Sequence, residues 1–261
     1  MGTPTEIYEI QKDLDKLFDC TNEWQMLFNV DKCKCIHYGH NNPQHTYSIG
    51  GNDVVNDSKE KDLGVIINDS LSVSDQVSKV VNTANSVLGL IYRAYEDKSK
   101  QNIIKFYKSL VRPHLEYSVQ AWCPYLKKDI EKIEKVQHRA TRMISSISNL
   151  SYDERLIKTN LITLENRRLR SDIIEVWKIM HGLEGLSPND LFIMSSTMHD
   201  ANPTRGHTFK IFKQHSRLNL RKFFFSHRIV DTWNSLPAEI AECMNINTLK
   251  NKLSNFFNWN C

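Results

Sequence analysis

The sequence lacks the patterns that mark secreted, membrane-spanning and disordered proteins. Its six cysteines fall into no disulfide-scaffold spacing, which indicates free thiols and a reducing compartment. Apolar runs such as 87–92 are short, and the first residues show no basic segment followed by an apolar one, so we expect neither a membrane span nor a signal peptide. With 40% hydrophobic and 25% charged residues, the composition excludes disorder and predicts a folded intracellular protein, nuclear or cytoplasmic.

Common catalytic signatures are also missing. The sequence contains no Gly-x-Ser-x-Gly, His-Glu-x-x-His or Gly-x-x-x-x-Gly-Lys motif. A two-metal polymerase site needs converging carboxylates, often as adjacent aspartates, and no Asp-Asp pair occurs. We therefore expect no catalytic residue, no metal and no cofactor in this chain.

One metal site is an alternative. Cys33, Cys35 and His37 alternate along an expected strand, and His40 or His45 could add a fourth ligand. Zinc sites usually use tighter paired spacings, and cysteines are common on buried strand faces. We favour core packing over zinc for these residues.

Charge is distributed unevenly along the chain. Residues 1–99 hold 9 Lys/Arg against 15 Asp/Glu, whereas residues 100–261 hold 25 against 15, so the net charge of +4 hides a basic second half. Within that half, residues 201–230 contain no acidic residue. This asymmetry predicts a polyanionic partner for the second half.

Periodicity predicts an α+β fold that is mostly α. A first helix is expected from about Ile7 to Leu27, followed by a small antiparallel β element. This element contains a hairpin with its turn at 50–53 and a further strand at 63–67. From Ser74 onward the pattern is helical. Helical stripes cover 77–91, 103–110, 130–147, 161–180 and 248–259, with a loop at 183–202. Pro113 is expected to end the second stripe and Gly182 the fourth.

The candidate nucleic-acid-binding residues are all basic. They are Arg112, Arg139, Arg142, Arg167, Arg168, Arg205, Lys210, Lys213, Arg217, Arg221 and Lys222. Each phosphate contact adds salt-dependent affinity with little sequence preference. Around 139–142 and 167–170 a solvated helix face with ion pairs is an equal alternative. For 201–230 we favour a polyanion, because no local acid neutralises the cations, whereas Phe223–Phe225 more often fill a core than stack on bases.

Several short phrases follow one another in a fixed order. They include 14–17 (Leu-Asp-Lys-Leu), 26–33 (Met-Leu-Phe-Asn-Val-Asp-Lys-Cys), 61–65 (Lys-Asp-Leu-Gly-Val), 110–117 (Leu-Val-Arg-Pro-His-Leu-Glu-Tyr), 151–156 (Ser-Tyr-Asp-Glu-Arg-Leu) and 233–237 (Trp-Asn-Ser-Leu-Pro). Together these phrases resemble the C-terminal part of reverse transcriptases of non-LTR retrotransposons, of the jockey and chicken-repeat type.

The resemblance implies that the chain corresponds to the later part of a right-hand polymerase, from the end of the palm onward. Residues 1–75 would be the end of the palm, with Lys32 near the phosphates of the incoming nucleotide and Lys61, Leu63 and Gly64 in a primer-grip-like hairpin. Residues 76–150 would form a helical thumb, and residues 151–261 a basic connecting region that contains the loop at 183–202.

The family's aspartate motifs lie upstream of the matching residues. The resemblance therefore implies a truncated RNA-directed DNA polymerase that keeps template–primer binding and does not polymerise alone, although its parent class uses Mg. The expected partners are RNA, DNA or their hybrid, an upstream palm and fingers portion, and no membrane. A protein-interaction module or a non-functional relic of a mobile element is the alternative.

Overall fold

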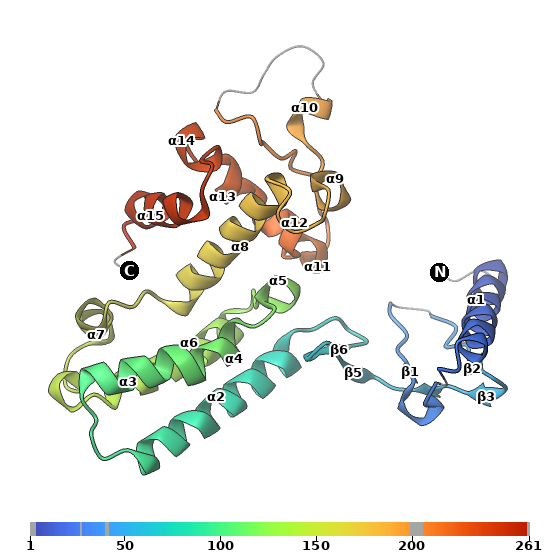
Figure 1. Cartoon of the computed structure of the whole chain (residues 1–261), viewed down its shortest axis with the longest axis horizontal. Helices are drawn as coiled ribbons and strands as arrows, with labels where there is room; N and C mark the ends of the chain where they lie inside the picture. Colours follow the sequence, from blue (N-terminus) through green and yellow to red (C-terminus); the bar gives the residue numbers. More distant parts are fainter. Residues whose placement is uncertain (1–3, 27, 40–41, 199–205, 260–261) are drawn as a thin grey trace. The chain divides into compact units, whose positions relative to one another are not determined.

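The computed structural model describes residues 4–26, 28–39, 42–198 and 206–259. These residues are mostly helical with three small two-stranded sheets, which confirms the expected α+β class (Figure 1). The chain divides into two compact units, Met1–Gln76 and Val77–Cys261. Among the described residues, no helix is both long enough and apolar enough to cross a membrane.

The first unit combines one long helix with short strands. Its elements are α1 (Pro4–Glu23), a 3₁₀ turn (Val30–Lys32), β1 (Lys34–Cys35), β2 (Ser48–Ile49), β3 (Asn52–Asp53), β4 (Val55–Asn56), β5 (Lys59–Asp62) and β6 (Val65–Asn68). Strands β1 and β4 pair in parallel, and β2–β3 and β5–β6 are antiparallel hairpins. The small β element is therefore only partly antiparallel.

Both hairpins turn through two residues with positive φ. In the first, Gly50 and Gly51 have φ of 58° and 78°, which confirms a hairpin here but shortens the expected turn. In the second, Leu63 and Gly64 have φ of 43° and 91°. Turns that match the twist of a hairpin need positive φ at both positions. The expected strand at 63–67 therefore begins only at Val65, and Leu63 and Gly64 form its turn.

Helix α1 makes few apolar contacts within its unit. The side-chain amide of Gln11 joins it to β2, donating to the Ser48 carbonyl at 2.9 Å and accepting from the Ser48 N–H at 3.0 Å. Its apolar stripe is only partly covered. Leu14 and Phe18 are half-buried, whereas Leu17 is 49% exposed and Trp24, just after the helix, is 72% exposed. The periodicity correctly gives a helix, but the unit covers only part of its apolar side.

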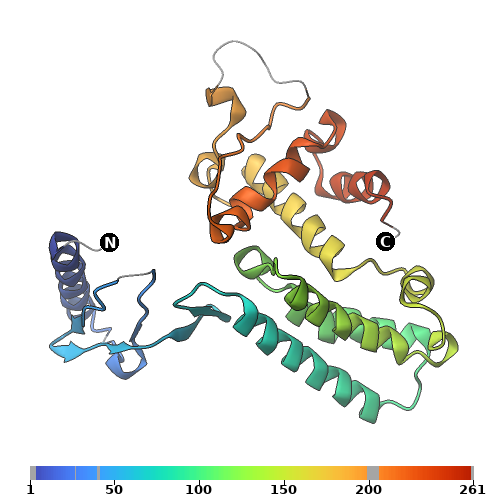
Figure 2. The ribbon, with the colours of Figure 1, turned by 180° about the vertical axis from the view of Figure 1, so that it is seen from behind.

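The second unit is a succession of helices. After α2 (Ser74–Ala94) come α3 (Lys100–Phe106), a π-helical turn (Tyr107–Val111), α4 (Arg112–Glu116), α5 (Val119–Trp122), α6 (Lys127–Arg142), a 3₁₀ turn (Ser145–Ile147), α7 (Tyr152–Thr159), α8 (Leu164–Met180), α9 (Pro188–Leu191), α10 (Ser195–Met198), α11 (Asn219–Lys222), α12 (Phe225–Arg228), α13 (Val230–Asn234), α14 (Ala238–Ala241) and α15 (Ile246–Phe256). Helices α2, α3 and α6 lie side by side in both views (Figure 1, Figure 2).

The expectation that Pro113 ends a helix is wrong. Helix α3 passes through the π-helical turn Tyr107–Val111 directly into α4, and Pro113 lies in the first turn of α4. Proline lacks an N–H donor and its ring clashes with the carbonyl four residues earlier in a regular helix. The wider π turn changes that spacing, so the chain stays helical across the proline.

An apolar core surrounds α8. Trp233 and Leu249 are fully buried against residues of α8 such as Ile173 and Val176. Gly182, with φ of 67°, follows the end of α8, as expected for a C-terminal stop. The expected loop 183–202 contains the single-turn helices α9 and α10 in its described part, and its last residues lie outside the described range.

Helix α7 begins with a reciprocal cap. The Glu154 N–H donates to the Ser151 hydroxyl oxygen at 3.4 Å, and the Ser151 N–H donates to the Glu154 carboxylate at 2.8 Å. Ser151→Ala should therefore lower the free energy of unfolding by about 1 kcal/mol, measured by urea denaturation. An unchanged midpoint and slope would show that the cap contributes nothing.

Candidate nucleic-acid interface

Four cations occupy one side of α6. Lys132, Lys135, Arg139 and Arg142 fall within about a quarter of the helix circumference, because residues advance about 100° each. The opposite side is buried through Ile133 and its neighbours. Within the described part of the chain, neither Lys135 nor Arg139 nor Arg142 forms an ion pair. We call Lys132, Lys135, Arg139 and Arg142 the α6 basic face.

Helix α2 contributes to the same surface. Lys132 donates to the Ser78 hydroxyl at 2.8 Å and Arg139 to the Asn85 side-chain oxygen at 3.3 Å, so both cations lean across to α2. A hollow of about 260 Å³ between the two helices is lined by Arg139, Arg142 and Tyr92. An exposed aromatic ring beside unneutralised guanidinium groups suits a polyanion that also carries planar bases.

A second basic surface lies near α11. Arg217, Arg221 and Lys222 are exposed, Lys210 is half-buried, and Lys213 is exposed. These five residues are the C-terminal basic surface. Arg205 lies outside the described residues.

The expectation that no acid neutralises the window 201–230 is wrong for two of its cations. Asp231, just past the window, forms an ion pair with Lys213. Arg228 is held by both carboxylate oxygens of Asp172, at 2.9 and 3.0 Å, from helix α8. Asp172 is 56 residues away in sequence, so a window of sequence cannot reveal this pair.

The cluster at 167–170 belongs mainly to the interior. Arg167 forms a bidentate ion pair with Glu116, which also lies 3.7 Å from Arg112. Arg168 is only 3% exposed. We therefore leave Arg112, Arg167 and Arg168 out of the interface. Helical ion pairs were the alternative for this cluster, but the acid comes from α4 and not from a neighbour on α8.

The remaining candidate residues lie in the first unit, and Lys32 is well separated in sequence from the other three. Lys32 is exposed at the end of the 3₁₀ turn, and Lys61 is exposed in β5. Leu63, at 85% exposed, and Gly64 form the hairpin turn. Among the described residues of this unit, Lys16 forms an ion pair with Asp13, and neither Lys32 nor Lys61 takes part in it.

Of the described residues proposed as zinc ligands, Cys35 and His37 lie in contact. Cys35 Sγ lies 3.7 Å from His37 Nε2, and His37 also contacts the Asn56 side chain at 3.2 Å. Burial raises the pKa of the Cys35 thiol, which disfavours the thiolate that a metal needs. Among the described residues, no group of three or more such ligands converges, and His40 lies outside that range.

Sequence reasoning missed the groups that surround the C-terminal basic surface. Phe223 stacks on Tyr125 with ring centroids 4.5 Å apart, Phe225 is buried in the core, and Phe224 is exposed. His227 and Ser216 contact each other at 2.8 Å beside Arg221. The three adjacent phenylalanines were a sequence signal for aromatic groups at this surface. Only the fold shows which of them is buried in the core and which is exposed.

Comparisons with known proteins give one distant similarity. The chain is 24% identical over 129 residues to uncharacterized protein B0403.1 of Caenorhabditis elegans, and the match covers 48% of this chain and 63% of that protein. The chain thus spans less than two thirds of that relative. No family model and no solved structure matches the sequence.

Proposed function

We propose that this chain binds RNA, DNA or their hybrid through the α6 basic face and the C-terminal basic surface, with little sequence preference. The observation that carries the proposal is that Lys135, Arg139 and Arg142 share one exposed helix side and form no ion pair with any described residue. Cations without acidic partners are free to release counterions from phosphates, which supplies salt-dependent affinity.

We further propose the family context that the resemblance implies. Residues 1–75 would correspond to the end of a reverse-transcriptase palm, 76–150 to its thumb and 151–261 to the region after the thumb. Helices α2, α3 and α6, with a basic outer side, suit a thumb that holds a template–primer duplex. Without an Asp-Asp pair, the chain as given has no ligand set for metal-assisted nucleotidyl transfer, so we expect no polymerisation by it alone.

A salt series tests nucleic-acid binding directly. The full chain is titrated into a labelled RNA–DNA hybrid at several salt concentrations and scored by fluorescence anisotropy. The variant Arg139→Gln/Arg142→Gln/Arg217→Gln/Arg221→Gln should reduce the slope of log affinity against log salt by about 3 to 4, at about 0.9 per lost phosphate contact. Affinity at low salt should fall by at least about 100-fold.

The matched control removes four exposed cations elsewhere. Lys12→Gln/Lys100→Gln/Lys105→Gln/Lys158→Gln lowers the net charge equally, and its slope should change by less than about 1. Equal losses in both variants would mean that only net charge matters. A loss of less than a few-fold in the arginine variant would contradict the proposed surfaces.

A protein-interaction role is the second candidate function. The exposed part of the apolar stripe of α1, with Leu17 and Trp24, favours it, because large apolar side chains grouped on a surface mark contact sites. The upstream palm and fingers portion of a polymerase would be one such partner. Absence of any nucleic-acid binding at low salt would leave this role or the relic as the explanation.

A further inference from the structure

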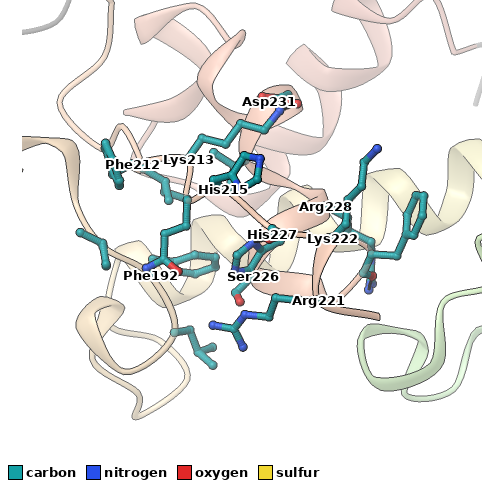
Figure 3. A pocket seen from close by; sticks show the side chains of 17 residues that line it. Phe192, Phe212, Lys213, His215, Arg221, Lys222, Ser226, His227, Arg228 and Asp231 are labelled. Atoms are coloured by element: carbon teal, nitrogen blue, oxygen red, sulfur yellow. Dashed lines mark hydrogen bonds and ion pairs between the residues drawn. The ribbon is translucent and has the colours of Figure 1, made fainter. Parts of the chain in front are cut away.

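A cavity lies beside the C-terminal basic surface, and its lining combines apolar, cationic and neutral polar side chains. It has a volume of about 480 Å³ and lies among α11, α12, α13 and the segments 191–193 and 211–216 (Figure 3). Phe192, Ile211 and Val230 are buried and give it an apolar floor. A volume of this size is typical of small-ligand sites, and polar or charged side chains make up 10 of the 17 lining residues.

The rim of the cavity is cationic. Figure 3 shows Lys213, Arg221 and Lys222 among the side chains that line it. Lys213 forms an ion pair with Asp231, but neither Arg221 nor Lys222 forms one within the described ranges. An anionic group could bind either of these side chains without displacing an acid.

A neutral polar pair completes the lining. The His227 ring nitrogen Nδ1 lies 2.8 Å from the Ser216 hydroxyl. Burial and the nearby Arg221 guanidinium lower the pKa of His227, so the imidazole is uncharged at pH 7 and offers one donor and one acceptor. Such a pair can bond the polar edge of a planar heterocycle.

We propose that this cavity takes one unpaired nucleotide, with the base over the Phe192 floor near His227 and Ser216, its phosphate against Arg221 and a neighbouring phosphate of the strand at Lys222. The cavity combines what a nucleotide needs, namely an apolar surface for a ring, hydrogen-bonding groups at its edge and a cation for its phosphate. A base inside a duplex cannot enter without leaving its stack, so single strands should be preferred. This inference rests on the proposed function where the nucleotide belongs to a strand, and a free nucleotide offers the same chemistry.

The test compares three ligands on the full chain. Anisotropy and calorimetry measure binding of a ten-nucleotide oligouridylate, a ten-base-pair RNA–DNA hybrid and free UMP. Two variants alter the cavity differently: Arg221→Gln/Lys222→Gln removes the cations, and Ile193→Trp fills the space from a half-buried lining position. Lys100→Gln/Lys105→Gln, which removes two exposed lysines of α3, is the charge-matched control, and circular dichroism verifies that each variant is folded.

Both cavity variants should weaken the single strand by at least about 10-fold. Ile193→Trp should weaken the hybrid by less than 3-fold, whereas Arg221→Gln/Lys222→Gln also removes two cations of the C-terminal basic surface and should weaken the hybrid, but less than the single strand. The control should change neither. Removal of the two cations should also lower the single-strand salt slope by about 1.4. Equal losses for single strand and hybrid, or losses below 3-fold with folded Ile193→Trp, would overturn the inference. Binding of UMP that the cavity variants abolish, together with no binding of either oligomer, would retain the cavity and overturn the proposed function.

Discussion

Replacing Arg228 with leucine is expected to lower the free energy of unfolding by about 3–5 kcal/mol at pH 7. The Arg228 side chain is 14% exposed and its partner Asp172 only 4%. The guanidinium also donates to the carbonyls of Gln120 and Phe223, at 3.3 and 3.2 Å. The substitution would leave a buried carboxylate without its cation and two carbonyls without a donor, which costs far more than the loss of a surface ion pair.

The pH dependence of this loss has a defined sign. Burial raises the pKa of Asp172, and the Arg228 guanidinium opposes the shift. In Arg228→Leu the larger opposing charge is gone and only the weaker effect of Arg168 remains, so the carboxyl pKa rises further. A raised folded-state pKa gives stability that is fully present below the unfolded value of about 3.9 and is lost as pH rises through the folded value. The deficit relative to the parent chain should therefore grow from pH 4 to pH 7.

Urea denaturation at several pH values checks this prediction. The control Arg217→Leu removes an exposed cation from the same basic window and should change stability by about 0.5 kcal/mol or less. Adding Asp172→Leu to Arg228→Leu should recover part of the loss, because the buried carboxylate is then gone, although the buried Arg168 also loses this acid. A deficit that is the same at pH 4 and pH 7 would show that Asp172 does not depend on Arg228.

The pair also illustrates where sequence reasoning stops. Helical periodicity gives α2, α6 and α8 because each is long enough to repeat an apolar stripe several times. Helices α11 to α14 have four or five residues each, so no stripe can repeat within them. The cations of 201–230 are visible in the sequence, but their partners are set by tertiary contacts such as that of Asp172 with Arg228.

The candidate site shows the same division. The α6 basic face follows from spacing, since cations at positions 132, 135, 139 and 142 must share one side of a helix. Arg168 is different, because it lies four residues from both Leu164 and Asp172, which are also buried. Its spacing from Leu164 indicates burial, but arginine is so rarely buried that its residue type predicts an exposed side chain.

The second large effect concerns a polar residue inside the helical bundle. Gln137 lies on the apolar stripe of α6 and is fully buried. Its side-chain oxygen accepts from the Tyr107 hydroxyl at 2.8 Å, and its amide donates to the Ile162 carbonyl at 2.9 Å and to the Tyr152 hydroxyl oxygen at 3.0 Å. One side chain thus joins the π-helical turn, α6, α7 and the segment before α8.

Gln137→Leu should lower the free energy of unfolding by about 3 kcal/mol, measured by urea denaturation. A leucine fits an apolar stripe, but it leaves the Tyr107 hydroxyl and the Ile162 carbonyl buried without partners, at about 1–3 kcal/mol each. The exposed Gln101→Leu on α3 is the control and should change stability by about 0.5 kcal/mol or less.

A double-mutant cycle separates the network from simple loss of contacts. Tyr107→Phe alone leaves the Gln137 oxygen unpaired, and in Gln137→Leu/Tyr107→Phe both of these unpaired groups are gone. The double variant should therefore be more stable than the sum of the two single effects predicts, by about 1 kcal/mol or more. Additive effects would mean that the Tyr107–Gln137 hydrogen bond does not couple the π-helical turn to α6, and the buried glutamine would then act only through Ile162 and Tyr152.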